Sequence, residues 1–434
     1  MAERRRPRSD RPIPAGRIGR LARLASLGAR TGASLVTSRT GDAAARQAAE
    51  VLGNLRGLAA KVGQMASYLD GAVPEEHRAA YEKALAGLRA AAPTSSPLQI
   101  RGVVEAELGA PIDRLFARWN DRPIASASIG QVHVALLEDG REVAVKVQHP
   151  GIDRAVEADL RNAGVIERMA GLAGAAIGRK LESRRLFDEV AERFREELDY
   201  RLEAKHQQSF QKLHTGDPQI QIPNVVSERS SRRVLTTELA RGRSFEEAAQ
   251  GTPEDRLAHA RTLWRFVFKG NLVGSMFNAD PHPGNYLFGD AGHVTFLDFG
   301  CVQIIGREHN REACGLHLSA LRRDERAFLE HARRMLGTRP GSYEDFARGF
   351  TRLCFEPLFR SPYRITREYV AGLVGRISAA KRMMLTDSGF VQLPPGMVFM
   401  NRLQFGFYSV LARFDVEVDY AAVERAFLSE AGIY

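Results

Sequence analysis

The segment 123–151 constrains the fold most, because it has the pattern of a β-hairpin with a lysine inside an apolar strand. Val132 and Val134 alternate with polar neighbours, an Asp-Gly pair supplies the turn, and residues 143–147 read as the return strand. Lys146 stands among the valines of that strand, and a charge flanked by valines needs partners, or its burial costs several kcal/mol. Taken alone, Lys146 is better explained as a strand lysine that points to water, because such a string is common by chance.

The chain of 434 residues is long enough for two or three packed units. Hydrophobic residues make up 44% and charged residues 26%, which argues against a mostly disordered or fibrous chain. The three cysteines, Cys301, Cys314 and Cys354, are too few and too scattered for a disulfide framework or a zinc knuckle, which favours a reducing compartment.

The segments around the hairpin are mainly helical by their apolar periodicity. We expect helices over 42–92, a short helix over 98–109 and a charge-rich helical stretch over 152–212. The segment 222–242 predicts two more strands and an exit segment.

The part of the chain after residue 244 also predicts helices, with one interruption at 278–300. That interruption is a Pro/Gly loop followed by a second hairpin, which turns at 289–292. The apolar stretch 396–413 contains two arginines, so we interpret it as a buried helix, and no window predicts a transmembrane helix.

Asp280 and Asn285 lie five residues apart in the loop ADPHPGN. A rigid Pro/Gly loop can turn a carboxylate and an amide toward one cleft, where Asp280 would orient or deprotonate a nucleophile and Asn285 would bind Mg²⁺. The alternative is an Asx-turn loop, a common use of these residues beside Pro and Gly.

Asp298 follows a predicted strand in Phe-Leu-Asp-Phe-Gly. Its carboxylate suits the Mg²⁺ that bridges nucleotide phosphates, although a strand-end turn aspartate is the alternative. A loop of small residues on a hairpin, a strand lysine, an acidic helix, an Asp-x4-Asn loop and an Asp-Phe-Gly follow one another here in the order of a protein-kinase-like ATP site.

The loop of small residues at 125–130 occupies the place of a glycine-rich phosphate loop. Methyl groups replace hydrogens there, which narrows the backbone conformations available near phosphate. The chain contains no GxxxxGK[ST] or GxGxxG sequence, so P-loop and Rossmann sites are not supported.

The net charge of +10 is concentrated at the N-terminus. Residues 1–40 hold ten arginines and two acids, for +8, while the other 394 residues carry 52 bases and 50 acids, for +2. This argues against nucleic acid as a partner of the body. Residues 17–39 form a basic amphipathic pattern, either a contact with an anionic membrane surface or a helix packed on the body.

Together these motifs resemble the UbiB/AarF family of atypical kinases, and the resemblance covers the chain from about Gly16 to its C-terminus. The stretches that carry it are KVGQ at 61–64, PIASASIGQVH at 123–133, VAVKVQHPGI at 143–152, EELDYRLEA at 196–204, ADPHPGN at 279–285 and DFG at 298–300.

The resemblance implies a role for each matching residue. Lys146 would bind the α- and β-phosphates and pair with Glu203, Asp280 would be the catalytic acid or base, and Asn285 and Asp298 would bind Mg²⁺. Glu238 would begin the hinge that meets adenine. The loop residues implied to contact ATP are Ala125, Ser126, Ala127, Ser128, Ile129, Gly130 and Gln131.

Lys61 and Gln64 would fold over the cleft, where Lys61 would meet Glu197 and Asp199. The residue spacing agrees only in part. Asp199 and Glu203 are four residues apart and share a helix face, but Glu197 and Asp199 lie about 200° apart on a regular helix, so both can reach Lys61 only if the helix breaks.

The expected fold is therefore a bilobal, kinase-like α+β fold with an N-terminal helical KxGQ extension and a mostly helical C-lobe. The expected divisions are a basic arm at 1–41, the extension at 42–118, an N-lobe at 119–243 and a C-lobe at 244–434.

The expected function is that of an ATP- and Mg²⁺-dependent kinase or ATPase that supports isoprenoid-quinone or related lipid biosynthesis, in the cytoplasm or peripherally at a membrane surface. UbiB-like members of the family often end in transmembrane helices, which this sequence does not predict. His206 stands where members of the family usually have Asn. The alternatives are a non-catalytic nucleotide-binding scaffold and a small-molecule phosphotransferase.

Overall fold

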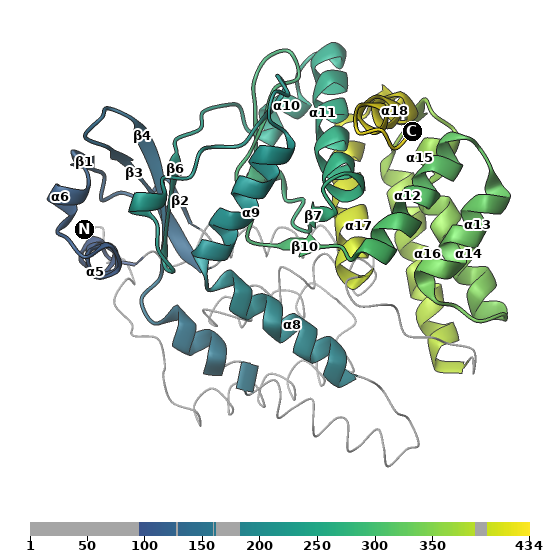
Figure 1. Ribbon diagram of the computed structural model, residues 1–434, viewed down its shortest axis with the longest axis horizontal. Coiled ribbons are helices and arrows are strands. Elements are labelled where there is room, and N and C mark those ends of the chain that lie inside the picture. Colours follow the sequence, from purple (N-terminus) through teal and green to yellow (C-terminus); the bar gives the residue numbers. More distant parts are fainter. Residues whose placement is uncertain (1–94, 127–128, 159, 162–182, 387–396) are drawn as a thin grey trace, which may run out of the picture. The chain divides into compact units, whose positions relative to one another are not determined.

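The computed structural model describes residues 95–126, 129–158, 160–161, 183–386 and 397–434. These residues form two compact units (Figure 1). Unit 1 contains the described residues up to Leu202 together with Val225–Leu239, and unit 2 contains Glu203–Asn224 and Ala240–Tyr434. The boundary therefore falls inside one helix, α9 (Tyr200–Leu213).

Unit 1 is built on a five-stranded antiparallel sheet of order β1-β3-β4-β6, in which β2 also pairs with β3. Its strands are β1 (Arg118–Trp119), β2 (Ala125–Ser126), β3 (Gly130–Leu136), β4 (Glu142–Gln148) and β6 (Val234–Glu238). The predicted hairpin is confirmed as β3 and β4. Gly140 lies in its turn with a φ of 86°, a left-handed conformation that glycine adopts without steric cost.

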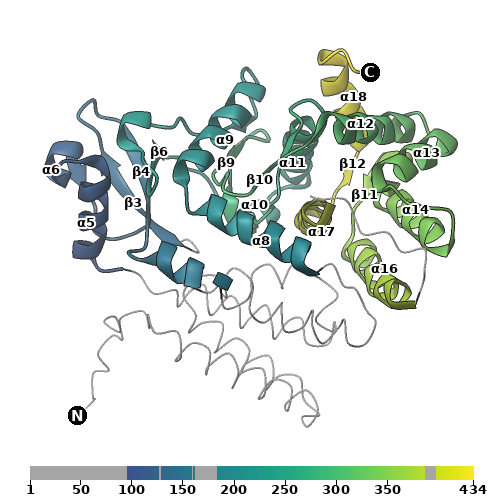
Figure 2. The ribbon, with the colours of Figure 1, turned by 60° about the horizontal axis from the view of Figure 1, so that its bottom comes forward.

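One face of this sheet forms the core of unit 1 with α5 (Pro97–Leu108) and α6 (Ile112–Leu115), which lie side by side in Figure 2. Val143, Val145 and Val147 are fully buried on that face. In the first strand of the hairpin, Val132 and Val134 are half-buried.

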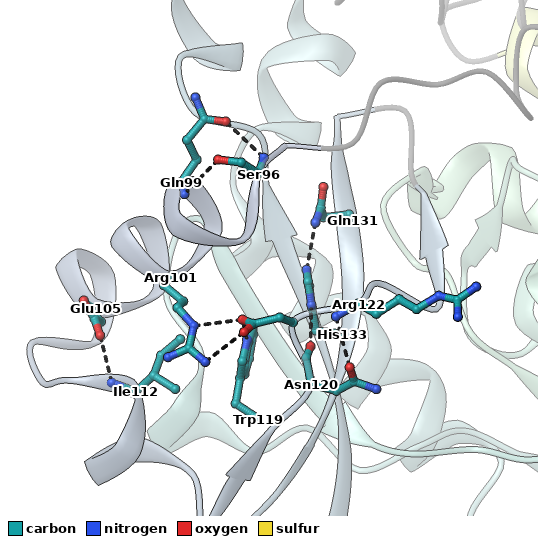
Figure 3. A network of polar contacts seen from close by, with 11 residues as sticks. Ser96, Gln99, Arg101, Glu105, Ile112, Trp119, Asn120, Arg122, Gln131 and His133 are labelled. Carbon is teal, nitrogen blue, oxygen red and sulfur yellow. Dashed lines mark hydrogen bonds and ion pairs between the residues drawn. The ribbon is translucent and has the colours of Figure 1, made fainter. Parts of the chain in front are cut away.

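The buried positions of β3 include two polar side chains, Gln131 and His133. Pairing places Gln131 opposite Val147 and His133 opposite Val145, on the core face. A hydrogen-bond network satisfies these two buried polar residues, as Figure 3 shows.

The predicted short helix is confirmed as α5. Ser96 and Gln99 form a capping box at its start, where each side chain bonds the other residue's backbone N–H (Figure 3). Gly109 ends the helix in the left-handed conformation with a φ of 74°.

The prediction of two strands in 222–242 is half wrong. Only β6 forms, and Val225 makes an isolated bridge to Thr237. The intervening residues form a short 3₁₀ turn, η1 (Ser227–Arg229), and Ser230 bonds backbone groups on both sides of it. These local bonds compete with a second full strand.

The charge-rich stretch contains a break between α8 (Ser183–Glu197) and α9. Residues 152–158 are helical, and residues 198 and 199 separate the end of α8 from the start of α9. Asp199 lies in this break, one residue before α9 begins. The expectation that Asp199 and Glu203 share a face of one helix is therefore corrected.

Unit 2 is mostly helical, as expected after residue 244. Its helices are α10 (Phe245–Ala249), α11 (Pro253–Leu272), α12 (Arg307–Leu321), α13 (Glu325–Leu336), α14 (Ser342–Cys354), α15 (Glu356–Phe359), α16 (Arg367–Thr386), α17 (Met397–Phe414) and α18 (Tyr420–Glu430). The unit also contains the greater part of α9.

Short strands join these helices in three small sheets. They are β5 (Ile220–Gln221), β7 (Met276–Asn278), β8 (Tyr286–Phe288), β9 (Val294–Phe296), β10 (Val302–Ile304), β11 (Tyr363–Arg364) and β12 (Glu417–Val418). The predicted second hairpin is confirmed as β8 and β9, with Ala291 and Gly292 at positive φ in its turn.

The core of unit 2 contains a buried carboxylate, Glu424, which has no exposed surface. It accepts a hydrogen bond from Trp264 Nε1 at 3.0 Å and lies 2.8 Å from His317 Nδ1. These contacts join α11, α12 and α18. Most of the described side chains at the C-terminal end of α17, among them Phe407 and Phe414, are buried, in agreement with the predicted buried helix, while Arg413 is exposed.

Several expectations fall on residues outside the described ranges. They are the basic arm and the amphipathic segment 17–39, the helices of 42–92 with Lys61 and Gln64, and the loop residues Ala127 and Ser128. Among the described residues, no helix is long and apolar enough to span a bilayer.

Candidate active site

The loops that carry Asp280 and Asp298 lie between two small sheets of unit 2. Antiparallel pairing of β7 with β10 places Asn278 opposite Val302, and pairing of β8 with β9 places Tyr286 opposite Phe296. Because the two loops are tethered at both ends, residues 279–285 and 297–301 are neighbours. Backbone bonds from Ala279 N to Cys301 O at 2.7 Å and from Leu297 N to Asn285 O at 3.0 Å close the arrangement.

Asp280 and Asn285 come together, as the loop sequence predicted. The amide Nδ2 of Asn285 lies 3.1 Å from the backbone oxygen of Asp280 and 3.4 Å from its Oδ2. Asp280 is only 6% exposed, and its backbone N–H donates to Asn278 Oδ1. A 3₁₀ turn, η2 (Pro283–Asn285), and a bond from Gly284 N to His282 Nδ1 shape the rest of the loop.

Asp298 is held in a tight turn at the end of β9. Its Oδ1 accepts the N–H of Gly300 at 2.9 Å, and its backbone oxygen accepts from Asn278 Nδ2 at 2.6 Å. Asn278 therefore bonds both the Asp280 loop and the Asp298 turn. Sequence reasoning missed this residue, whose signal was a polar side chain at the end of a short strand just before Asp280.

Glu203 brings a third carboxylate to this part of unit 2. It is 4% exposed, and a Cβ built on Gly300 would lie 3.5 Å from Glu203 Oε2 and 3.3 Å from Asp298 Oδ1. The two carboxylates thus flank the same glycine. A cation among them would be favoured, because like charges this close in a buried setting repel one another.

The phenylalanine between Asp298 and Gly300 anchors the turn. Phe299 is fully buried and packs against Phe210 of α9 at 5.3 Å and Phe266 of α11 at 6.4 Å between ring centroids. Since Glu203 also lies on α9, the aromatic contacts fix the helix that carries Glu203 against the turn that carries Asp298.

Lys146 lies on the other face of the unit 1 sheet from the valine core. It is half-buried, and strand pairing places it opposite Val132 on β3 and Leu235 on β6. Its Nζ lies 5.1 Å from the centre of the Tyr200 ring, a cation–π contact. The lysine therefore has an aromatic contact inside unit 1, and the reading of a solvated strand lysine is not supported.

Tyr200 is a site residue that sequence reasoning did not single out. Its hydroxyl lies 2.9 Å from the place where a Cβ on Gly130 would stand, and Val147 O lies only 2.3 Å from that place. Glycine is thus required where β3 begins, because a side chain would collide with the backbone of β4. The signal was available as the aromatic residue directly after Asp199 in EELDY.

Gln148 is a second residue that the motif analysis passed over. Its Nε2 donates to the backbone oxygen of Leu198 at 2.9 Å, and Tyr200 N donates to Arg232 O at 2.9 Å. The break between α8 and α9 is therefore fixed to β4 and to the approach of β6, and Lys146 lies two residues away from the anchoring side chain.

The described residues of the small-residue loop are placed differently from one another. Ala125 and Ser126 are exposed on β2, whereas Ile129 and Gly130 are buried. The side chain of Gln131 is 1% exposed and faces the core, away from Lys146. The expected contact of Gln131 with ATP stays a prediction, and it would have to involve the backbone, because the side chain is hydrogen-bonded inside unit 1.

The acidic pair expected to meet Lys61 lies across the α8–α9 break. Glu197 ends α8 and Asp199 follows it by two residues, so the break needed for both to face one partner is present. Asp199 forms an ion pair with Arg201, with Nε and Oδ1 3.1 Å apart. Burial raises the pKa of Asp199, but the bonds from Arg201 outweigh burial and leave the pKa below its ordinary value.

The remaining hinge candidate, Glu238, ends β6 and is half-buried. It lies opposite Val143, and the next backbone N–H, of Leu239, donates to Glu142 O at 3.0 Å. Glu238 therefore stands where β6 leaves the sheet at the boundary of unit 1.

The donor atoms fit a magnesium–nucleotide complex. The amide nitrogen of Asn285 lies within hydrogen-bond distance of Asp280, so its oxygen is the atom that could bind a metal ion, and Asp298 has a carboxylate that could do the same. Mg²⁺ prefers one or two such oxygens together with phosphates and water. In the described residues no group of three His, Cys, Asp or Glu side chains forms a metal site made of protein ligands alone.

The family model and two of the known proteins that this chain resembles are described as atypical kinases or kinase-like. A model of the ABC1 atypical kinase-like domain matches residues 87–332. The mitochondrial atypical kinase COQ8B of Rattus norvegicus is 32% identical over 321 residues, which are 69% of this chain and 59% of that protein. The mitochondrial atypical kinase coq-8 of Caenorhabditis elegans is 30% identical over 353 residues, which are 75% of this chain and 46% of that protein.

A solved structure extends the likeness over most of the chain. The complex of Rv3197 with erythromycin, from Mycobacterium tuberculosis, has a TM-score of 0.60 and 29% sequence identity, and the match covers 93% of this chain and 96% of that one. The chain spans about half the length of the curated relatives it matches. Since the domain model matches more than half of its residues, the chain belongs to the ABC1 atypical kinase-like family, the UbiB/AarF kinases.

Proposed function

We propose that the chain is an ATP- and Mg²⁺-dependent phosphotransferase or ATPase. The observation that supports this proposal is that the loop of Asp280 and Asn285 is hydrogen-bonded to the loop of Asp298 in unit 2, with Glu203 near Gly300. Hydrolysis or transfer of a phosphoryl group requires positioning and charge compensation more than covalent chemistry, and these side chains supply both.

Each side chain then has a distinct task. Asp280 orients or deprotonates the attacking hydroxyl or water, and Asn285 and Asp298 hold Mg²⁺ on the phosphates. Lys146 binds the α- and β-phosphates and pairs with Glu203. The ion itself neutralises charge on the phosphate oxygens when bound.

The nucleotide base would lie on the Lys146 face of the unit 1 sheet. Alternation along the strands places Val134, Ala144 and Thr237 on that face, and each is half-buried. Glu238 begins the hinge, whose backbone groups would bind adenine. Ala125–Gly130, as backbone, would cover the phosphates.

The finer architecture belongs to the same proposal. Unit 1 and unit 2 would be the two lobes of a kinase-like fold, and the divisions 1–41, 42–118, 119–243 and 244–434 would hold. Lys61 and Gln64 of KVGQ would lie over the cleft, with Lys61 at Glu197 and Asp199. Such a cover would disfavour a protein substrate and favour hydrolysis coupled to the handling of a small molecule.

The substrate class we propose is an isoprenoid lipid or quinone precursor. The names of the relatives COQ8B and coq-8, together with the family resemblance, support this class. Residues 17–39, basic and amphipathic by sequence, would place the protein at an anionic membrane surface.

The test of the activity is phosphate release by the purified chain in the presence of ATP and Mg²⁺. Asp298→Asn should abolish release, because it removes a charged metal ligand, and should keep the fold. Asp290→Asn serves as the matched control, since Asp290 lies exposed in the β8–β9 turn. Equal, near-zero release by both variants and the wild type, with nucleotide still bound, would replace the enzyme by a nucleotide-dependent scaffold.

A second candidate function is binding or phosphorylation of a small molecule that is not a quinone precursor. The solved relative that matches 93% of this chain is described as a complex with erythromycin, a ligand of that protein. Adding erythromycin or a phenolic head-group compound to the phosphate-release assay separates the two. Stimulation by the macrolide alone would favour the second candidate.

A further inference from the structure

Four hydrogen-bonding groups in unit 1 form a closed ring around the base of the small-residue loop. Ser95 N donates to Gln131 Oε1 at 2.8 Å, and Ser95 Oγ lies 2.9 Å from His149 Nδ1. His149 N in turn donates to Ile129 O at 2.9 Å. Ser95 is thus linked to both sides of the point where the loop joins β3. It bonds Gln131 directly, and it is linked to Ile129, two residues earlier, through His149.

The strand register shows why this point matters. Gln131 pairs with Ser126 across the β2–β3 ladder, so it is the last paired residue before the loop tip. Residue 149 directly follows β4. We call the contacts of Ser95 with Gln131 and His149 the clasp. It limits how far β2 and the start of β3 can move relative to the residue that follows β4.

The polar network beneath Gln131 fixes the orientation of its amide (Figure 3). His133 Nδ1 lies 2.8 Å from the backbone oxygen of Asn120, which can only accept, so Nδ1 carries the proton. His133 Nε2 must then accept from Gln131 Nε2, 2.8 Å away, which turns Gln131 Oε1 toward the N–H of Ser95. From Ser95 N through Gln131 and His133 to the backbone oxygen of Asn120, each group therefore donates a hydrogen bond to the next one.

This series of hydrogen bonds requires the imidazole of His133 to be neutral, and the surroundings of the ring favour the neutral form. His133 has no exposed surface, and Trp119 stacks on it with ring centroids 4.9 Å apart. Burial lowers the pKa of His133, although the Asn120 carbonyl and the charge of Asp121 oppose this shift. The network is therefore a fixed support in the neutral range.

We propose that Ser95 is a positioning residue, which fixes the small-residue loop for nucleotide binding through Gln131 and His149. The inference rests on the proposed function, because it gives the loop its phosphate-contacting role. Ser95 is the first described residue of the chain, and it is joined to the loop base by hydrogen bonds to Gln131 and His149.

The experiment compares Ser95→Ala, which deletes the Oγ contact, with Ser96→Ala. Ser96 is adjacent and equally small, but its side chain caps α5 by accepting the N–H of Gln99. Two measurements are made on the full chain: the affinity for a fluorescent ADP with Mg²⁺, and hydrogen exchange of the amides of Gly130 and His149. Melting temperature is recorded for each variant.

Ser95→Ala should weaken nucleotide binding roughly fivefold, the effect of one ordinary hydrogen bond, and speed exchange at His149 by a similar factor. Its melting temperature should fall by about as much as that of Ser96→Ala, because each variant loses one side-chain hydrogen bond. Ser96→Ala should lower the melting temperature and leave nucleotide affinity unchanged. His149→Ala should match Ser95→Ala, and the double variant should be no worse than either, because both remove the same contact.

The opposite results overturn the clasp: unchanged exchange at His149 in Ser95→Ala, an equal loss of affinity in Ser96→Ala, or additive effects in the double variant. If the wild type binds no nucleotide, the proposed function fails. The exchange measurement still decides whether Ser95 holds the loop base, so the two failures are distinguishable.

Discussion

His214, at the C-terminal end of α9, should make the protein lose stability as the pH falls below neutrality. It follows directly after the end of the helix that carries Glu203, is 3% exposed and stacks on Phe266 with ring centroids 5.2 Å apart. In the described structure neither ring nitrogen has a hydrogen-bond partner. Burial lowers the pKa of His214 to about 3, and the charge of Lys269 acts in the same direction.

The sign follows from proton binding in the two states. Between the folded pKa of about 3 and the ordinary value of 6.5, the unfolded chain binds a proton at His214 that the folded chain does not. Stability therefore rises with pH across this window. From about pH 8 to about pH 5, His214 alone should lower the free energy of unfolding by about 2 kcal/mol, because each pKa unit corresponds to 1.36 kcal/mol.

The assay is urea unfolding of the wild type and two variants, His214→Phe and His214→Gln, at both pH values. The variants differ in their absolute stability, since phenylalanine suits the aromatic site and a buried glutamine does not. Both lack the titrating ring, so each should lose about 2 kcal/mol less than the wild type on acidification. A wild type with the same pH dependence as both variants would refute the reasoning.

Three further predictions concern close packing and the buried carboxylate. Gly130→Ala should lower the free energy of unfolding by about 1–3 kcal/mol in thermal melts, because its methyl group would lie 2.3 Å from a backbone oxygen, whereas Gly102→Ala, with open space around it, should not destabilise. Gly406→Ala would push on the proline after Asp280 at 2.7 Å and should reduce kcat for ATP more than it raises KM, with Gly372→Ala unaffected. Glu424→Ala should cost about 3–5 kcal/mol in urea melts, because it strips a buried histidine and an indole of their acceptor, and a loss below about 1 kcal/mol would contradict that assignment.

Long periodic segments and turn residues were predictable from the sequence. The β3–β4 hairpin, α5 and the β8–β9 turn follow from alternation, a capping serine and glycines in the left-handed conformation. The order of motifs also indicated the family, because six short patterns in sequence carry more information than any one of them. The roles of the site residues remain proposals.

Three-residue strands escape a sequence analysis because they are too short to show a period. The pairing of β7 with β10, which makes the Asp280 and Asp298 loops neighbours, depends on tertiary contacts of Asn278 and Phe299. Likewise, 222–242 carried strand-forming residues, but local bonds from Ser230 reduced the first strand to one bridge.

Buried polar networks were the other blind spot. In β3 the polar residues Gln131 and His133 are buried, whereas Val132 and Val134 are half-buried. This arrangement is stable because Gln131 and His133 hydrogen-bond each other and two backbone groups, Ser95 N and Asn120 O. A sequence pattern records polarity, and it does not record whether a buried polar group will meet its partner.

The most direct test of the central claim is a structure of the chain with a non-hydrolysable ATP analogue and Mg²⁺. The account predicts Mg²⁺ at about 2.1 Å from Asn285 Oδ1 and from a carboxylate oxygen of Asp298, with the triphosphate near Lys146. A metal ion bound away from both side chains, or a nucleotide on the Gln131 and His133 face of the sheet, would contradict it.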